Sequence, residues 1–363
     1  MSAIAEMIAI VRDVRRMTQD QLSEAAGVGQ GYISMIQRGQ RIPSDATLSA
    51  IAEALDCPVE LLKMDGPIRG GEAQDLHFRR RKTLPISERR RLESKLHLAY
   101  LTVRGLLRGI DYEPSLLLPV LDIEEVESPT EAAHLVRRLW RVPTGPIRNL
   151  TAYLEAAGMF FIPCTAPNKV DAVTRRCEEG WNVTVYNDQM PADRQRLTRA
   201  HELGHLVLHG GYMGPQAEEE ANEFAAELLT PAEEIRQHLA GLTTGHLSKL
   251  IDLRLHWRVS VPFLVHRAAD LGCVSERQQR SFYQLLNARG VMYQTVDAQL
   301  PSEVPALLQR IIAVHHENHG YTLEDLAAAA LMTPQRFVRK FQSIRPSSVA
   351  GGQCAQPTLR VVH

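Results

Sequence analysis

The pattern of apolar and polar positions in the first 64 residues predicts five short helices. Apolar side chains recur there every three or four residues, the spacing that gathers them on one face of a helix. They are Ile8, Val11 and Val14; Leu22, Ala25 and Ala26; Ile33 and Ile36; Leu48, Ile51 and Ala52; and Leu61 with Leu62. Thr18 is a typical N-cap for a helix that begins at Gln19, and Gly27 would end that helix. A second helix from about Gln30 to Gly39 completes a helix-turn-helix.

The middle of the chain alternates between helical and strand patterns. Residues 85–88, Pro-Ile-Ser-Glu, resemble the start of a helix, whose spacing continues from residue 89 until residues 111–114 interrupt it. Helices are predicted again from residue 128 to 139 and from 147 to 157. The apolar run 159–163 and the alternating run 181–186 predict two strands.

Helical spacing then dominates the rest of the chain. One helix begins near Asp193 and continues to Gly210, and a second covers residues 217–229 before Thr230-Pro231 stops it. Four more helical segments follow at 247–255, 261–271, 275–289 and 305–316. Residues 321–337 resemble another helix-turn-helix only weakly, and an ordinary helical pair explains them better. The segment 347–363, rich in Gly, Gln and Pro, predicts a disordered tail.

Composition is typical of a globular protein with two or three domains, at 363 residues, 44% hydrophobic and 23% charged. No apolar run approaches the roughly 18 residues that a membrane span needs. Charged residues interrupt the apolar positions near the N-terminus, so no signal peptide is predicted, and we expect a cytoplasmic protein with no membrane partner. The five cysteines are scattered without Cys-x-x-Cys spacing, which favours reduced thiols.

Charge changes sign between the first segment and the next. Residues 1–64 hold six basic and eight acidic side chains, a poor balance for binding phosphates. Residues 69–95 hold nine basic and four acidic side chains, including the cluster Arg79 to Lys82. This basic stretch could supply phosphate contacts, although such runs are more often simply solvated.

The run His201-Glu202-Leu203-Gly204-His205 has the spacing of a zinc site on a helix. Two histidines four residues apart lie one above the other, so both imidazoles can reach one ion. Glu202 lies about 100° further round the helix, where it would act as a general base. His209 lies about 12 Å from His201 along the axis, too far to share the ion, and fits the final turn of the helix.

A catalytic zinc needs a third protein ligand and one open position. Glu218 lies on the apolar stripe of helix 217–229, and a carboxylate that points inward needs a partner. Glu220, one turn before Phe224, is the alternative ligand. Asn222 could orient a ligand from behind, and Tyr212 is a candidate donor to the oxyanion.

The first 64 residues resemble the phage-repressor-like helix-turn-helix family, known as Cro/C1 or XRE. The resemblance rests on Met17 to Leu22, Ala26 to Val28, Tyr32 to Gly39 and Pro43-Ser44. It implies that the second helix of the pair enters the major groove of an operator, to which such proteins bind as homodimers. The implied DNA-contacting residues are Gln19, on a phosphate, and Gln30, Tyr32, Ser34, Gln37 and Arg38, with Gln30, Tyr32, Ser34 and Gln37 exposed on the recognition helix.

Residues 129 to about 235 resemble the ImmA/IrrE family of zinc metallopeptidases. The motifs are His201 to His205 and the run Glu220 to Pro231, Glu-Ala-Asn-x-Phe-Ala-Ala-Glu-Leu-Leu-x-Pro. The resemblance implies zinc as cofactor, ligands at His201, His205 and Glu218, Glu202 as catalytic base, and a repressor-type protein as substrate. The strand 181–186, if it is an edge, could align that substrate.

Together these observations predict a mainly α-helical protein with a small α+β domain of the zincin-like metallopeptidase type. We expect a helix-turn-helix domain at 1–66, a basic linker and helical connector at 67–128, and the metallopeptidase domain at 129–235. A C-terminal helical domain at 236–345 and a tail at 346–363 would follow.

Three functions remain open at this point. The chain could be a DNA-binding regulator that is also an active zinc endopeptidase, cutting a repressor or itself. It could be a repressor whose peptidase-like domain is a catalytically silent sensor. It could also be a peptidase whose helix-turn-helix recognises a protein substrate and not DNA. Intact His201, Glu202 and His205 favour the first or the third, because a structural zinc would not need Glu202.

Overall fold

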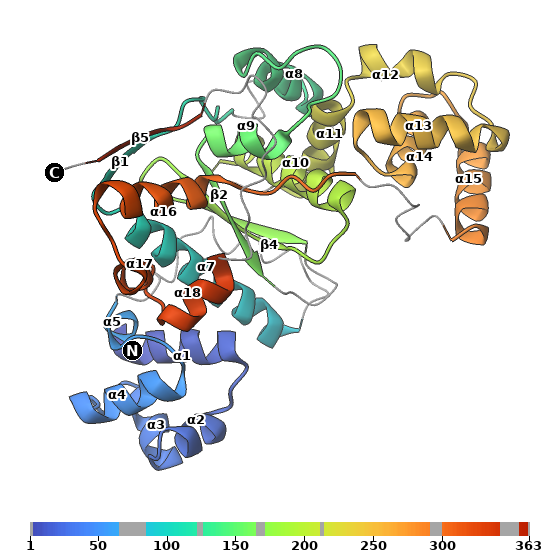
Figure 1. Ribbon diagram of the computed structural model, residues 1–363. Coiled ribbons are helices and arrows are strands. Elements are labelled where there is room, and N and C mark those ends of the chain that lie inside the picture. The colour runs from blue at the N-terminus through green and yellow to red at the C-terminus, as the bar shows by residue number, and fades with distance from the viewer. Residues whose placement is uncertain are drawn as a thin grey trace.

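The computed structural model describes residues 3–64, 85–121, 126–164, 171–210, 214–290, 300–341 and 356–361 (Figure 1). Its fold is mainly helical with two small sheets, as predicted. None of the described helices combines the length and the apolar character that crossing a membrane requires.

Five helices form the N-terminal module, as the apolar pattern predicts. They are α1 (Ala3–Arg15), α2 (Gln19–Ala25), α3 (Gln30–Gln37), α4 (Asp45–Ala54) and α5 (Val59–Leu62). The Thr18 hydroxyl accepts the Gln21 N–H at 3.1 Å, and the Gln21 side chain accepts the Thr18 N–H at 2.8 Å, which closes a capping box. Gly27, with φ of 64°, lets the chain leave α2 in the left-handed region.

Helix α7 (Ile86–Leu106) connects this module to the sheet, and it contacts both. Leu101 belongs to the core of the N-terminal module, whereas Leu92, Leu96 and Val103 belong to the core beneath the sheet. Figure 1 shows α7 running from the helix-turn-helix helices toward β1 (Ile110–Glu113). One helix therefore contributes to two cores.

The larger sheet has the order β2-β4-β3. Its strands are β2 (Met159–Cys164), β3 (Ala172–Arg176) and β4 (Asn182–Asn187). β2 pairs with β4 in parallel, with Phe161 opposite Thr184, and β3 pairs with β4 antiparallel, with Thr174 opposite the same residue. The proposed edge at residues 181–186 is wrong, because β4 is the central strand and both of its edges are paired.

Each face of this sheet packs on a different core. Met159 and Phe161 point into one core and Phe160 and Ile162 into the other, as alternation along a strand requires. Seven helices contribute to the first core: α8 (Pro129–Leu139), α9 (Leu150–Ala156), α10 (Ala192–Leu208), α11 (Ala217–Leu229), α12 (Ala232–Leu239), α13 (Leu247–Trp257) and α14 (Val261–Asp270). Helix α15 (Glu276–Ala288) adds Phe282 and Leu286 to it. The 3₁₀ turn η1 (Thr244–His246), directly before α13, has no buried residue.

The C-terminal helices are divided between these two cores, whereas the sequence predicts one separate helical domain over residues 236–345. Helices α12 to α15 extend the core that contains α10 and α11. The other side of the sheet is covered by α7 with α16 (Leu307–Asn318), α17 (Leu323–Ala329) and α18 (Pro334–Phe341). Helical spacing shows which face of a helix is apolar but does not show which neighbour covers that face.

The prediction of a disordered tail at residues 346–363 is wrong for residues 358–361. Thr358–Val361 forms strand β5, which pairs antiparallel with β1, with Ile110 opposite Val361. The likewise unpredicted β1 lies where the sequence indicates only a helix break. Pairing between segments so distant in sequence leaves no local signal.

Candidate metal centre and nucleic-acid interface

Helices α10 and α11 pack closely together at Gly204. A Cβ atom placed there would lie 3.1 Å from the Phe224 ring and 3.2 Å from the backbone of Ala221. Glycine therefore permits a close approach of the two helices that a larger side chain would prevent. This approach brings the acidic first turn of α11 to the two histidines of α10.

Three side-chain ligand atoms converge from these helices. His201 Nε2 lies 3.0 Å from His205 Nε2. Glu218 Oε2 lies 3.5 Å from His201 Nε2, and the other carboxylate oxygen, Oε1, lies 3.6 Å from His205 Nε2. Ligands about 2.1 Å from a tetrahedral zinc are separated by about 3.4 Å. Two imidazoles and one carboxylate thus fit three corners of a zinc tetrahedron and leave the fourth for water or substrate. Among the described residues this is the one such group of potential ligands.

Glu220, the alternative ligand, contacts a different histidine. Its carboxylate lies 2.8 Å from His209 Nε2, and His209 Nδ1 lies 3.2 Å from His205 Nδ1. His209 is buried and caps the C-terminal end of α10. His209 lies at the end of the helix, as predicted, but its position between Glu220 and His205 was not predicted.

Asn222 holds the other histidine, as the sequence predicts. Its Oδ1 lies 2.9 Å from His201 Nδ1. The Nδ1 atoms of His201 and His205 each contact another side chain, Asn222 and His209 respectively. A proton on Nδ1 can be donated in these contacts, and the unprotonated Nε2 then has its lone pair free for a metal ion. The arrangement therefore favours the tautomer that binds a metal.

Burial and the neighbouring carboxylates shift the pKa values of these histidines in opposite directions. Burial lowers the pKa of His201, but the hydrogen bond to Glu218 and the charges of Glu202 and Glu218 raise it, and the net direction is upward. The pKa of His209 is lowered, because burial outweighs its contact with Glu220. Glu202 itself is only 3% exposed and follows His201 directly on α10, so it is a buried residue next to a candidate metal ligand.

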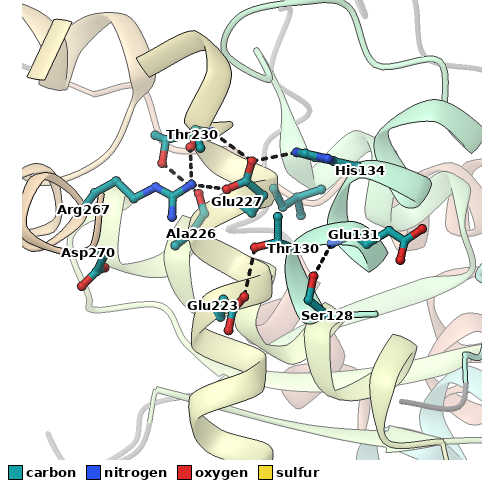
Figure 2. A network of polar contacts seen from close by, with 12 residues as sticks. Ser128, Thr130, Glu131, His134, Glu223, Ala226, Glu227, Thr230, Arg267 and Asp270 are labelled. Carbon is teal, nitrogen blue, oxygen red and sulfur yellow. Dashed lines mark hydrogen bonds and ion pairs between the residues drawn. The ribbon is translucent and has the colours of Figure 1, made fainter. Parts of the chain in front are cut away.

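Buried ion pairs fix the far end of α11. Figure 2 shows Glu227 between His134 of α8 and Arg267 of α14. Its carboxylate contacts His134 Nε2 at 2.7 Å and Arg267 Nη2, and it accepts the Ala232 N–H at 2.9 Å. Arg267 also donates to the Thr230 carbonyl at 3.0 Å. These contacts anchor the helix whose other end carries Glu218.

The first turns of α10 are anchored in the same way. Arg199 is 2% exposed and donates to Thr151 Oγ1 at 2.7 Å and to the Glu303 carbonyl at 3.0 Å, while its guanidinium lies over Tyr186. Arg196 pairs with the Glu303 carboxylate. The segment that begins near Asp193 is therefore held by buried polar contacts before it reaches His201. Glu227, Arg199 and Glu303 were not predicted, since their partners are distant in sequence.

The predicted DNA-contacting residues lie on α2 and α3. Gln30 and Arg38 are exposed, and Tyr32 and Ser34 are half-buried. Arg38 Nη2 donates to Ser34 Oγ at 2.6 Å. The expected exposure of Gln37 is wrong, because Gln37 is buried and its Oε1 accepts a hydrogen bond from Gln19 Nε2, so these two side chains join α2 to α3.

Two predicted features lie outside the described residues. These are Tyr212, the candidate oxyanion donor, and the basic cluster Arg79 to Lys82.

Fold and site together define a two-part protein that combines a helix-turn-helix module with a metallopeptidase-like α+β domain. Residues 8–62 match the helix-turn-helix family, and residues 164–269 match the IrrE N-terminal-like domain, a peptidase family. The chain therefore contains one domain of each kind.

Similar curated proteins are transcriptional regulators. The HTH-type transcriptional repressor RghR of Bacillus subtilis (strain 168) is 33% identical over 78 residues, which cover 21% of this chain and 55% of RghR. The transcriptional regulator ClgR of Mycobacterium tuberculosis (strain CDC 1551 / Oshkosh) is 39% identical over 70 residues, which cover 16% of this chain and 62% of ClgR. The chain thus spans between half and two thirds of the length of these relatives.

Proposed function

We propose that this chain is a transcriptional regulator that binds double-stranded DNA as a homodimer and is also a zinc-dependent endopeptidase. Its substrate would be a repressor-type protein or the chain itself, and cleavage would change gene expression. The observation that carries the peptidase part is the convergence of His201, His205 and Glu218 with one ligand position open. The similarity to named transcriptional regulators supports the DNA-binding part.

In the proposed mechanism, His201, His205 and Glu218 hold the ion, and Asn222 and His209 orient the two imidazoles. Bound zinc would polarise the scissile carbonyl and make a water molecule more acidic. Glu202 would accept the proton from the attacking water and donate it to the leaving amine. Its burial, at 3% exposure, keeps bulk solvent from competing for that proton.

The decisive experiment compares wild type with Glu202→Gln, both loaded with zinc and incubated with candidate repressors encoded nearby. We expect both to retain one zinc per chain, because Glu202 is not assigned as a ligand. Cleavage by the variant should fall by about 10²–10⁴-fold, the usual contribution of a general base. Fragments would be detected by mass spectrometry.

Glu219→Gln is the matched control, since Glu219 is an exposed carboxylate beside Glu218 and is not part of the group of potential ligands. It should cleave like wild type. If zinc-loaded wild type cuts neither the repressors nor itself, yet binds DNA, the domain is a silent sensor and the peptidase part of the proposal fails.

DNA binding is tested separately by an electrophoretic shift with DNA from upstream of the chain's own gene. We expect Gln30→Ala to weaken the shift, because Gln30 is exposed on α3. Gln278→Ala on α15 would be the control outside the module. Intact cleavage without any shift would favour a helix-turn-helix that recognises a protein substrate.

A further inference from the structure

A cavity of about 480 Å³ lies where the helix-turn-helix module meets the rest of the chain. Its walls come from the end of α1, the turn before α5, α7, the ends of β2 and β4, and α18. Figure 1 shows α18 beside α7 and above α1. The volume lies in the range of pockets that bind small molecules.

Positive charge dominates the lining of this cavity. Its charged lining residues are six cations and one carboxylate: Arg15, Arg91, Lys95, Arg336, Arg339, Lys340 and Asp56. Asp56 is already engaged, since its carboxylate accepts from Arg336 Nη1 at 2.8 Å and from Thr333 Oγ1 at 3.0 Å. The cations outnumber the acidic groups that could neutralise them within the cavity.

Lys340 is the clearest case of an uncompensated cation. It forms no hydrogen bond or ion pair with the residues that the structure describes. Burial, helped by the positive charges of Arg336, Lys95 and Arg15, lowers the pKa of Lys340 to about 8, although Cys164 acts in the opposite direction. Burial and Arg336 likewise lower the pKa of Arg15 to about 10. The lowered pKa values show that bringing these positive charges together is unfavourable in this cavity. Such a cluster of cations is typical of a site that binds an anion.

The cations are also held in place. Arg15 Nε donates to the Leu55 carbonyl at 2.9 Å and its Nη2 to the Asp56 carbonyl at 3.1 Å. Arg336 is fixed by its contact with Asp56. Guanidinium groups held in this way can present paired N–H donors to phosphate or carboxylate oxygens.

Most of the remaining wall is apolar. Val14 and Leu61 come from the module, and Ile162, Val185 and Met332 come from the opposite side. Such a wall suits an apolar or aromatic group attached to a charged one.

We propose that this cavity binds a small, multiply charged anion, a phosphorylated or polycarboxylate metabolite with an apolar portion. The ligand would lie between the module and the body of the protein and contact both. Occupancy would then change how firmly α1 and α5 are held against α7 and α18. The additional expectation that the ligand alters DNA affinity rests on the proposed DNA-binding function.

The test is isothermal titration calorimetry of the full chain, without added zinc, with three probes: AMP, inorganic pyrophosphate and citrate. We expect at least one probe to bind with a stoichiometry of one. Lys340→Met and Arg336→Met should each weaken that binding at least tenfold. Lys249→Met, which removes an exposed lysine from α13, should leave it unchanged.

The results of this titration identify the class of ligand and also show whether the proposal fails. Binding of AMP or pyrophosphate alone assigns a phosphate ligand, and binding of citrate alone assigns a polycarboxylate. The proposal is overturned if none of the three probes binds, or if Lys340→Met and Arg336→Met both bind as wild type does. Thermal melts of each variant establish that it is folded, and since calorimetry needs neither DNA nor a peptide substrate, the result does not depend on the proposed function.

Discussion

His209 illustrates how a single side chain can act on a metal centre that it does not touch. It lies between His205 and Glu220, at 3.2 Å from the first and 2.8 Å from the second. A carboxylate at the end of such a chain increases the electron density on the ligating nitrogen. The charge of Glu220 should therefore strengthen zinc binding through two imidazole rings.

We predict that Glu220→Gln binds zinc about 10- to 100-fold more weakly than wild type, the usual effect of removing a group that orients a ligand. A competition titration with a chromophoric chelator would measure the change. Glu219→Gln carries the same loss of charge one residue away and should bind zinc like wild type. Equal affinities for the two variants would contradict the role assigned to His209 and Glu220.

The identities of the ligands could be predicted from sequence to different degrees. The pairing of His201 with His205 follows from their spacing alone. Glu218 was expected to point inward from the apolar stripe of α11; its side chain is instead 48% exposed, although its carboxylate faces both histidines. The contact of Glu220 with His209 could not be predicted, because it depends on how closely α10 approaches α11. The exposure of Gln37 was predicted wrongly for a related reason. Helical spacing does not show that a polar side chain such as Gln37 is buried against a polar partner on another helix, here Gln19.

At the scale of elements, the crossing of α10 and α11 determines the site. Gly204 sets their separation, because a side chain there would meet Phe224 and Ala221 at 3.1 to 3.2 Å. The sequence shows a glycine within an apolar helix, but not which helix it faces.

We expect Gly204→Val to lower the free energy of unfolding by about 1–3 kcal/mol and to weaken zinc binding, since overpacking moves α11 and Glu218 away from the histidines. Gly204→Ala should have a smaller effect, because a shift of Phe224 and Ala221 by a few tenths of an ångström would make room for the single methyl group. Chemical denaturation and zinc titration measure both. Gly245→Val is the control, because the nearest atom to a Cβ there is 3.7 Å away. Full zinc affinity in Gly204→Val would rule out this account.

The ion pair at the other end of α11 gives a prediction for stability. Glu227→Gln would leave Arg267 buried without its carboxylate, which should cost about 3–5 kcal/mol at pH 7. Although burial raises the pKa of Glu227, the Ala232 N–H, Arg267 and His134 lower it below its ordinary value of 4.5. Its contribution is therefore present above pH 4.5 and is lost as pH falls through the lower, folded-state pKa.

Urea unfolding of wild type and Glu227→Gln between pH 3 and 7 would measure this contribution. The difference between them should shrink below pH 4.5. Glu223→Gln, an exposed change one turn earlier in α11, should stay within about 0.5 kcal/mol of wild type. A difference that does not vary with pH would show that Glu227 acts through packing and not through charge.

At the scale of the whole molecule, the two parts have separate cores that share helix α7. The N-terminal core contains Met7, Leu22 and Ile51 and includes Leu101 of α7. Helices α10 and α11, which carry the candidate metal ligands, belong to the core on the far face of the sheet. Local signals such as the N-cap at Thr18 and the apolar spacing were enough to predict the helices of the first part. The division of the C-terminal helices and the pairing of β1 with β5 depend on contacts across more than a hundred residues, which no local pattern encodes.

We predict that removing zinc with a chelator abolishes cleavage but leaves DNA affinity within about twofold of the zinc-loaded value, because the ion contacts neither α3 nor its core. Fluorescence anisotropy with labelled DNA, before and after chelation, measures this. A larger loss of DNA affinity would mean that the metal centre and the module are coupled through the sheet and α7.

The exposure of Glu218 has a consequence for how long an ion would stay. Its side chain is 48% exposed, against 17% for His201 and 4% for His205. A carboxylate at the surface can rotate away and be replaced by water within nanoseconds to microseconds, while the two imidazoles keep their places. The centre would therefore exchange its metal with the surroundings far faster than a closed four-cysteine site. Its occupancy, and with it any cleavage, would follow the free zinc concentration in the cell.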